Sequence, residues 1–239
     1  MKKIKTKVLL LFFIFSTAFC LYSGGFSFQV DFVSRYIWRG FDLNPVHKPA
    51  LQPQLTYAVG DSGFAVNLWC NFSFEDKNTD EVDFAFTYDF KTGENFALTV
   101  GLTSYNWVFI DGFKFKDDTT REFFVSAGLP KALLSPTFTF YYDINLGDGL
   151  YAELALGHSL PVNEKVAIEL SGKLGYNAGQ WLPDGADTGL SDLNFGAAVP
   201  FKIGKVTVTP YVNYTLVLLD FIKTLGENNH FWFGISIAR

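Results

Sequence analysis

Alternation between apolar and polar side chains over residues 26–38 constrains the fold more than any other feature of the chain. Neighbouring side chains of a β-strand point to opposite faces, so a period of two divides this segment into two faces. One face carries Phe26, Phe28, Val30, Phe32, Ser34, Tyr36 and Trp38, and the other carries Ser27, Gln29, Asp31, Val33, Arg35, Ile37 and the following Arg39. An aromatic face opposite a partly charged face is typical of a transmembrane β-barrel strand, which contacts lipid on one side and the barrel interior on the other.

The same pattern recurs along the rest of the chain and predicts a series of strands. They cover residues 26–38, 51–59, 64–74, 81–90, 96–108, 119–129, 137–144, 153–156, 166–174, 192–199, 206–216 and 231–237. We therefore predict an all-β protein, a transmembrane antiparallel up-and-down β-barrel of about 12 strands. Pro53 and Pro210 fall inside predicted strands, where each removes a hydrogen-bond donor, so we interpret them as strand starts or β-bulges. Counts of about ten or fourteen strands remain alternatives.

The lengths of the predicted connections favour an even number of strands. Connections after even-numbered strands are mostly short, at residues 60–63, 91–95, 161–165 and 202–205. Connections after odd-numbered strands are mostly longer, at residues 40–50, 110–118, 178–189 and 220–228, with residues 75–80 and the glycine turn near Asp148 as exceptions. Short periplasmic turns and long external loops are typical of bacterial outer-membrane barrels, which have an even number of strands.

A soluble sandwich or a lipocalin-like barrel is the alternative for this pattern, because its strands also alternate. Phe contributes 27 of the 239 residues, and aromatic residues make up 18% of the chain. A soluble core of this size does not normally need so many Phe residues. The second face consists mostly of Gln, Asn, Thr, Ser and Gly with few charges, which suits a wet enclosed space. These features favour the membrane barrel.

The N-terminus differs from the rest of the chain. Four lysines precede an apolar run at residues 8–15, and small residues follow. This order is typical of a cleaved secretory signal peptide, and the run is too short for a membrane helix. We predict a signal peptide at residues 1–22, a barrel domain at residues 23–239, and a location in the outer membrane of a Gram-negative-type bacterium. Cleavage after Cys20 would leave Cys70 alone, so the mature chain would form no internal disulfide.

One hairpin resembles a known family. The segments that carry the resemblance are Val33-Ser34-Arg35-Tyr36-Ile37-Trp38-Arg39-Gly40, Lys48-Pro49-Ala50-Leu51-Gln52 and Leu55-Thr56-Tyr57, with looser similarity at residues 68–71, 120–123 and 149–154. They are similar to the TorF-type porin family of bacterial outer-membrane proteins. The resemblance implies a β-barrel with a channel function, and the family supplies no catalytic residues to transfer to this chain.

Charged residues on the predicted inward face are the candidate pore-lining residues. They are Asp31, Arg35, Arg39, Asp83, Glu122, Asp143, Glu153, Glu169 and Lys173. Opposed charges across a narrow aqueous passage select solutes by the sign of their charge. Our hypothesis is an outer-membrane porin for passive diffusion of small polar or cationic solutes, with these solutes and outer-membrane lipid as its partners and no nucleic acid.

A plugged barrel is the alternative for the same charges. Twelve strands enclose only modestly more space than the eight whose interior side chains fill, so the charges could pair and close the lumen. The barrel would then have a structural or adhesive role.

An outer-membrane lipid-modifying enzyme is a further alternative, because some twelve-strand barrels are phospholipases with Ser, His and Asn on the wall. The histidines are His47, His158 and His230. His158 and Ser159 are adjacent, so their side chains point to opposite faces of a strand. No motif of a nucleophile surrounds any serine, and no His or Cys pair has the spacing of metal ligands. Asp117–Asp118 and the acids near residue 185 could hold calcium, but solvated loop acids are the interpretation we adopt. We therefore expect no enzymatic activity, no cofactor and no metal.

Overall fold

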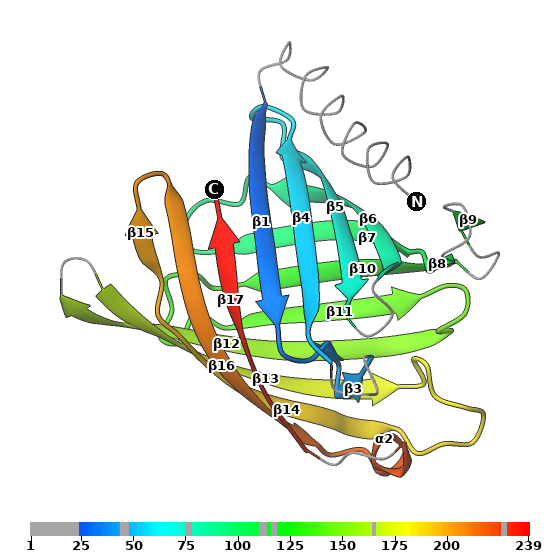
Figure 1. Ribbon diagram of the computed structural model, residues 1–239. Coiled ribbons are helices and arrows are strands. Elements are labelled where there is room, and N and C mark those ends of the chain that lie inside the picture. Colours follow the sequence, from blue (N-terminus) through cyan, green and yellow to red (C-terminus); the bar gives the residue numbers. More distant parts are fainter. Residues whose placement is uncertain are drawn as a thin grey trace.

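The structure is a computed structural model, which describes residues 24–43, 48–74, 78–109, 114–115, 119–163, 166–225 and 229–239. The predicted signal peptide at residues 1–22 lies outside the described residues, as do His47, Asp117 and Asp118. The described chain forms one large antiparallel sheet that closes on itself (Figure 1).

Within the described residues, twelve strands build this closed sheet. They are β1 (Gly25–Val33), β4 (Ala50–Ala58), β5 (Phe64–Ser73), β6 (Asn78–Phe90), β7 (Ala97–Tyr105), β10 (Thr120–Gly128), β11 (Thr137–Asp143), β12 (Gly149–Asn163), β13 (Val166–Ala178), β14 (Gly189–Ala198), β16 (Val206–Val217) and β17 (Asn229–Ala238). Each strand pairs antiparallel with the next in this order, and β17 pairs with β1 to close the ring. The predicted twelve-strand up-and-down barrel is confirmed, and counts of ten and fourteen are wrong.

The two prolines lie inside strands and do not shift the register. Pro53 pairs with Val30 of β1, and the registers of β4 with both of its neighbours continue through it. Pro210 lies in β16 opposite the break between β14 and a short strand, β15 (Phe201–Ile203), that continues in the same register. Our interpretation of the prolines as strand starts or bulges was wrong. Proline donates no backbone hydrogen bond, so each one interrupts the bonding locally and leaves the alignment of the strands intact.

The outer face of the barrel is its apolar face. Phe86, Phe140 and Leu170 point outward and are 54%, 47% and 41% exposed, whereas Asp83 on the inner face is 7% exposed. A soluble barrel would bury these apolar side chains in a common core and leave the carboxylate in water. The observed sidedness is that of a barrel whose outer surface contacts lipid.

The two rims of the barrel carry different connections. β1 begins and β17 ends at the same rim (Figure 1), which we call the terminal rim. Turns at this rim include residues 59–63, 91–96, 129–136 and 204–205. The opposite rim, which we call the loop rim, carries connections at residues 34–49, 106–119, 179–188 and 218–228, and shorter ones at residues 74–77 and 144–148. The predicted alternation of mostly short and mostly long connections is confirmed.

The first predicted strand was too long. β1 ends at Val33, and β2 (Ile37–Trp38) pairs with β3 (Phe41–Asp42) in a separate small hairpin. A second hairpin at the loop rim, which the sequence analysis also missed, joins β8 (Val108–Phe109) to β9 (Lys114–Phe115). The apolar–polar alternation continues from β1 into β2, so the sequence pattern does not reveal where the chain leaves the wall.

Several boundaries on the wall also differ from the prediction, among them the start of β6 and the end of β12. Residues 75–80 were expected to be a loop, but β6 already begins at Asn78. Residues 161–165 were expected to be a turn, but β12 continues to Asn163. Both strands are therefore longer than their alternation indicates. The earlier start of β6 adds Asp80 to the wall at the loop rim, next to Glu81.

A small apolar cluster holds the β2–β3 hairpin at the loop rim. Val217, Leu219 and Ile222 are buried together, and Phe41 of β3 and Leu182 pack against them. Ile222 belongs to α2 (Asp220–Thr224), a one-turn helix that the sequence analysis did not predict. The cluster ties the hairpin to two other connections. Among the described residues, helices with the length and apolar character to traverse a bilayer are absent.

Candidate functional site

The turn of the β2–β3 hairpin consists of Arg39 and Gly40. Both have positive φ angles, +50° and +85°, so the two strands are joined by a two-residue loop of the mirror-image type that favours tight hairpins. Glycine adopts this conformation without steric penalty, but a residue with a Cβ does so at a cost of about 1–2 kcal/mol. Arg39 therefore occupies a strained position, which the contacts of its side chain must offset.

The guanidinium of Arg39 forms a two-pronged ion pair with Glu122 of β10. Arg39 Nη1 lies 2.5 Å from Glu122 Oε2, and Nη2 donates to Oε1 at 2.9 Å. Only 8% of the Arg39 side chain and 1% of the Glu122 side chain are exposed. Parallel N–H···O bonds of this kind hold a guanidinium in one orientation. The pair thus joins the hairpin to the barrel wall.

Two further residues complete the hydrogen bonds of this ion pair. Gln180 Oε1 accepts from Arg39 Nη1, and Gln180 Nε2 donates to Glu122 Oε2 at 2.6 Å. The Tyr105 hydroxyl donates to Glu122 Oε1 at 2.9 Å. A buried ion pair is stable only where its remaining donors and acceptors are satisfied. In this barrel, Tyr105 of β7 and Gln180 of the β13–β14 connection supply these hydrogen bonds.

Three aromatic rings surround the guanidinium. Arg39 Cζ lies 4.1 Å from the ring centroid of Tyr141, and 4.5 Å from those of Trp38 and Tyr151. Cations bind the faces of aromatic rings at such distances. Burial alone would lower the pKa of Arg39, but the hydrogen bonds and charge of Glu122 outweigh burial and hold this pKa above its ordinary value. Arg39 is therefore a fixed positive charge inside the barrel.

The pore-lining residues predicted from sequence fall into separate groups. The structure brings together Arg39 with Glu122, and Lys173 with Glu153, whose Nζ and Oε2 atoms are 3.0 Å apart. Arg35, like Arg39, lies past the end of β1 and not on the wall as predicted, and its Nη1 is 3.7 Å from Asp42 Oδ2. The same nitrogen is 3.2 Å from Nδ1 of the buried His230.

The remaining predicted residues have local partners. Asp31 accepts from Gln29 Nε2 at 2.7 Å, and Asp83 accepts from the backbone N–H of Asn106 at 3.1 Å. Asp143, at the end of β11, accepts from the Thr120 hydroxyl and from two backbone N–H groups, so that it fixes the turn into β12. Glu169 lies towards the terminal rim, in the first part of β13.

Sequence reasoning missed several members of the Arg39 network. Gln180 lies in a predicted loop, Tyr105 and Tyr141 lie in predicted strands without a proposed role, and Tyr151 lies before the predicted strand at residues 153–156. Tyr151 also donates to Asp192 Oδ1 at 2.9 Å. The available signal was the presence of Tyr on the polar face of three strands near the loop rim. That signal does not indicate which charge the rings surround.

A cavity of about 380 Å³ adjoins this network at the loop rim. Most of its lining residues are aromatic. The lining comes from three connections and from the loop-rim ends of three strands, β5, β6 and β7. The lining residues are Tyr36, Trp38, Phe41, Leu43, Asn71, Asp80, Glu81, Tyr105, Trp107 and Trp181. We call this space the aromatic cavity.

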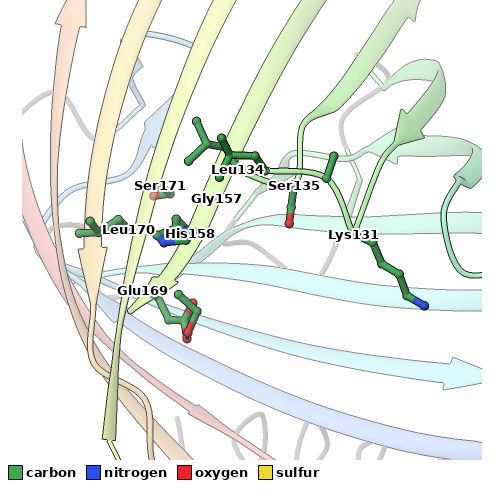
Figure 2. A pocket seen from close by; sticks show the side chains of 11 residues that line it. Lys131, Leu134, Ser135, Gly157, His158, Glu169, Leu170 and Ser171 are labelled. Carbon is green, nitrogen blue, oxygen red and sulfur yellow. The ribbon is translucent and has the colours of Figure 1, made fainter. Parts of the chain in front are cut away.

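A second cavity, of about 670 Å³, lies near the terminal rim (Figure 2). It is lined by the β10–β11 turn and by facing residues of β12 and β13, including His158 and Glu169. The Ser159 hydroxyl donates to Glu169 Oε1 at 2.8 Å, and the alternation of the strand directs His158 away from Ser159. Figure 2 shows the Lys131 side chain directed away from His158 and Glu169. Ser159 is therefore hydrogen-bonded to a carboxylate and lies on the opposite face of β12 from His158.

Comparison with known proteins gives a family and a fold. Residues 22–214 match the family model Gcw_chp, described as a bacterial protein of unknown function. No curated protein matches the chain.

Several solved structures are similar to this chain at low sequence identity. The NanC porin has a TM-score of 0.51 at 12% identity, over 88% of this chain and 97% of its own. The translocator domain of the autotransporter NalP from Neisseria meningitidis has a TM-score of 0.46 at 11% identity, over 99% of this chain and 95% of its own. The loop-deleted OmpT of Vibrio cholerae has a TM-score of 0.41 at 10% identity, over 90% of this chain and 99% of its own. At such identity the likeness to the NanC porin shows the fold alone, that of an outer-membrane β-barrel.

Proposed function

Because the chain belongs to the Gcw_chp family, described only as bacterial proteins of unknown function, we propose its function from the barrel itself. The protein is an outer-membrane channel for the passive diffusion of small polar or cationic solutes. Its partners are outer-membrane lipid and these solutes, and the segment at residues 1–22 directs its export. The barrel has no catalytic role.

The observation that carries this proposal is the sidedness of a closed barrel. Apolar side chains such as Phe86 and Phe140 point outward, and ionic side chains such as Glu153 and Lys173 point inward. In a barrel that crosses a membrane, a polar interior suits water and dissolved solutes. The resemblance of residues 33–40 to the TorF-type porins supports the same function.

The Arg39–Glu122 pair forms the constriction in this proposal. The β2–β3 hairpin extends from the loop rim and reaches the wall at Glu122 of β10, so the passage narrows beside the pair. Six of the nine predicted pore-lining residues are acidic and three are basic. An excess of carboxylates in a narrow polar passage attracts cations and repels anions.

A closed structural barrel is the second candidate, and a specific observation favours it. Arg39 and Glu122 are almost completely buried and are surrounded by Gln180 and aromatic rings. At this level side chains take up much of the space within the ring. Removing the Arg39 side chain would then open a passage that the native protein lacks.

Conductance in planar lipid bilayers tests both candidates. The native protein is expected to conduct K⁺ in preference to Cl⁻, and Arg39→Ala is expected to raise the single-channel conductance because it widens the constriction. Lys131→Gln, in an exposed turn at the terminal rim, is the control and should conduct as the native protein does. If the Arg39→Ala variant conducts and the native protein does not, the result would favour the closed barrel. If neither protein conducts, or if the native protein prefers anions, the channel proposal would be contradicted.

A further inference from the structure

The aromatic cavity at the loop rim has the chemistry of a binding site for a neutral sugar. We propose that it binds one or two rings of a saccharide, packed against indole rings and hydrogen-bonded through the sugar hydroxyl groups to carboxyl and amide groups. Its volume of about 380 Å³ lies within the range of small-molecule sites. The site does not depend on conduction. If the channel proposed above conducts, the site also names the class of polar solute that enters it from the loop rim.

Trp107 and Glu81 lie side by side in the wall of the cavity. Their backbones form an isolated antiparallel bridge between β6 and the chain after β7. Residues directly opposite each other in such a bridge have Cβ atoms about 4.5–5.5 Å apart, so the ring and the carboxyl group can contact the same ligand. A sugar ring has apolar C–H faces and hydroxyl groups around its edge. An indole ring next to a carboxyl group therefore suits both surfaces of a sugar.

A second indole ring is fixed against the first. The rings of Trp107 and Trp181 meet edge to face, with centroids 5.7 Å apart and planes at 84°. Trp181 has a φ of +56°, which is unusual for a bulky residue, and its backbone N–H donates to the carbonyl of Gly147 at 2.9 Å. Strain of this kind persists where the surrounding structure imposes it, and it is concentrated at functional sites. The two rings form a corner into which the apolar face of a sugar can pack.

The polar groups of the cavity are oriented by neutral partners. The Tyr36 hydroxyl donates to Glu81 Oε2 at 3.2 Å, and Asn71 Nδ2 donates to Asp80 Oδ1 at 2.8 Å. Gln52 Nε2 in turn donates to Asn71 Oδ1 at 3.0 Å. A carboxyl group accepts several hydrogen bonds, so one bond orients it without exhausting its capacity. Such acceptors suit the hydroxyl groups of a sugar whether the carboxyl groups are ionised or protonated.

Other classes of ligand match the cavity less well. Among its described lining residues Lys, Arg and His are absent, and the neighbouring Arg39 is paired with Glu122, so an anion would lack a counter-charge. A cation would lie near the charge of Arg39, whose guanidinium already lies 4.5 Å from the centroid of the Trp38 ring. A purely apolar ligand would cover Asp80 and Glu81 without offering them hydrogen bonds, which is costly. A neutral ligand with many hydroxyl groups avoids all three conflicts.

Titration of the full-length protein with cellobiose tests the inference, in a detergent without a sugar headgroup such as lauryldimethylamine oxide. Calorimetry and tryptophan fluorescence measure binding. Saturable binding is expected, weaker by about fivefold or more in Trp107→Leu and in Glu81→Leu, since each loses one recognition element. Glu81→Gln keeps a hydrogen-bond acceptor at the same place and should retain most of the affinity. Trp232→Leu, which removes an indole ring outside the cavity lining, is the matched control and should bind as the native protein does.

A second titration distinguishes the source of the sugar. It uses lipopolysaccharide that either carries or lacks its outer polysaccharide. If the form with polysaccharide binds more tightly than cellobiose, the ligand is a surface glycan; if it binds more weakly, the ligand is a free saccharide. Retention of the heat-modifiable gel shift shows that each variant is folded.

Four outcomes would overturn the inference: no saturable binding of either saccharide, tighter binding of benzyltrimethylammonium or benzoate, equal losses in Trp232→Leu and Trp107→Leu, or a loss in Glu81→Gln as large as in Glu81→Leu. The last outcome would show that the site depends on the charge of Glu81 and not on its hydrogen bonds. A barrel that conducts ions without binding a saccharide would leave the channel standing and remove this site. A barrel that binds a saccharide without conducting would do the reverse.

Discussion

Arg39 combines three properties that are unfavourable when taken singly. It is charged, its side chain is 8% exposed, and its backbone has a positive φ. The ion pair with Glu122 offsets the loss of hydration, and the rings of Trp38, Tyr141 and Tyr151 add further attraction. These contacts also hold the turn in its strained conformation. A change at Glu122 should therefore affect both the charge and the hairpin.

Glu122→Gln is expected to lower the free energy of unfolding by about 3 kcal/mol, because it leaves the Arg39 charge buried without a counter-charge. Urea unfolding in lipid vesicles, followed by tryptophan fluorescence, measures this change. Lys173→Met is the control. It breaks the ion pair with Glu153, whose side chains are 45% and 15% exposed, so the loss should stay below about 1 kcal/mol. Equal losses in the two variants would show that the Arg39 pair contributes no more than a solvated one.

At the scale of elements, the β2–β3 hairpin is separate from the wall that surrounds it. Its strands pair only with each other in the described sheet, whereas each wall strand pairs with two neighbours. The apolar cluster around Ile222 and the ion pair of Arg39 hold the hairpin in place. The hairpin can therefore be displaced without loss of the barrel.

Gly40→Val is expected to displace the hairpin, because a β-branched residue does not tolerate a φ of +85° and its Cβ would lie 3.2 Å from Cβ of Asp192. Trypsin should then cleave after Arg39, which is buried in the native protein, while the heat-modifiable gel shift of the barrel persists. Gly93→Val is the control, since Gly93 has a φ of +88° but open space around it at the terminal rim. Protection of Arg39 in the Gly40→Val variant would contradict this account.

At the scale of the whole molecule, closure of the sheet separates two environments. Each wall strand contributes apolar side chains to the outside and polar ones to the inside, so the outer surface carries a broad apolar belt. In water such a belt would lead to aggregation, and in a bilayer it matches the acyl chains. The effect of a substitution on the stability of the barrel therefore depends mainly on whether the residue lies on the outer or the inner face of the wall, and less on its position along the chain.

Phe86→Arg should lower the free energy of unfolding in lipid vesicles by about 2–4 kcal/mol, because Phe86 lies on the lipid-facing side, 54% exposed. Thr87→Arg, one residue further along β6 and on the inner face, is the matched control. Its loss should be clearly smaller, since the inner face is polar. If the Thr87 variant were the less stable of the two, the assignment of the two faces would be wrong.

Local sequence patterns are sufficient to define the wall of this barrel. Side-chain alternation has a period of two and is a local property, so Phe84, Phe86 and Asp83 could be assigned to their faces without knowledge of any partner strand. The number of alternating segments predicted about twelve strands, and the lengths of the connections predicted the two kinds of rim. Local patterns could not show that β1 ends at Val33, because alternation continues through Trp38 into a hairpin that does not belong to the wall.

Which charged side chains come into contact depends on the fold of the whole chain. Arg39 is 83 residues from Glu122 and 141 residues from Gln180, and closure of the ring together with the Arg39–Gly40 turn brings the three side chains into contact. Trp38, Trp107 and Trp181 converge on one cavity for the same reason. Such contacts depend on the register of the whole sheet and on where each connection is directed, which no short stretch of sequence encodes.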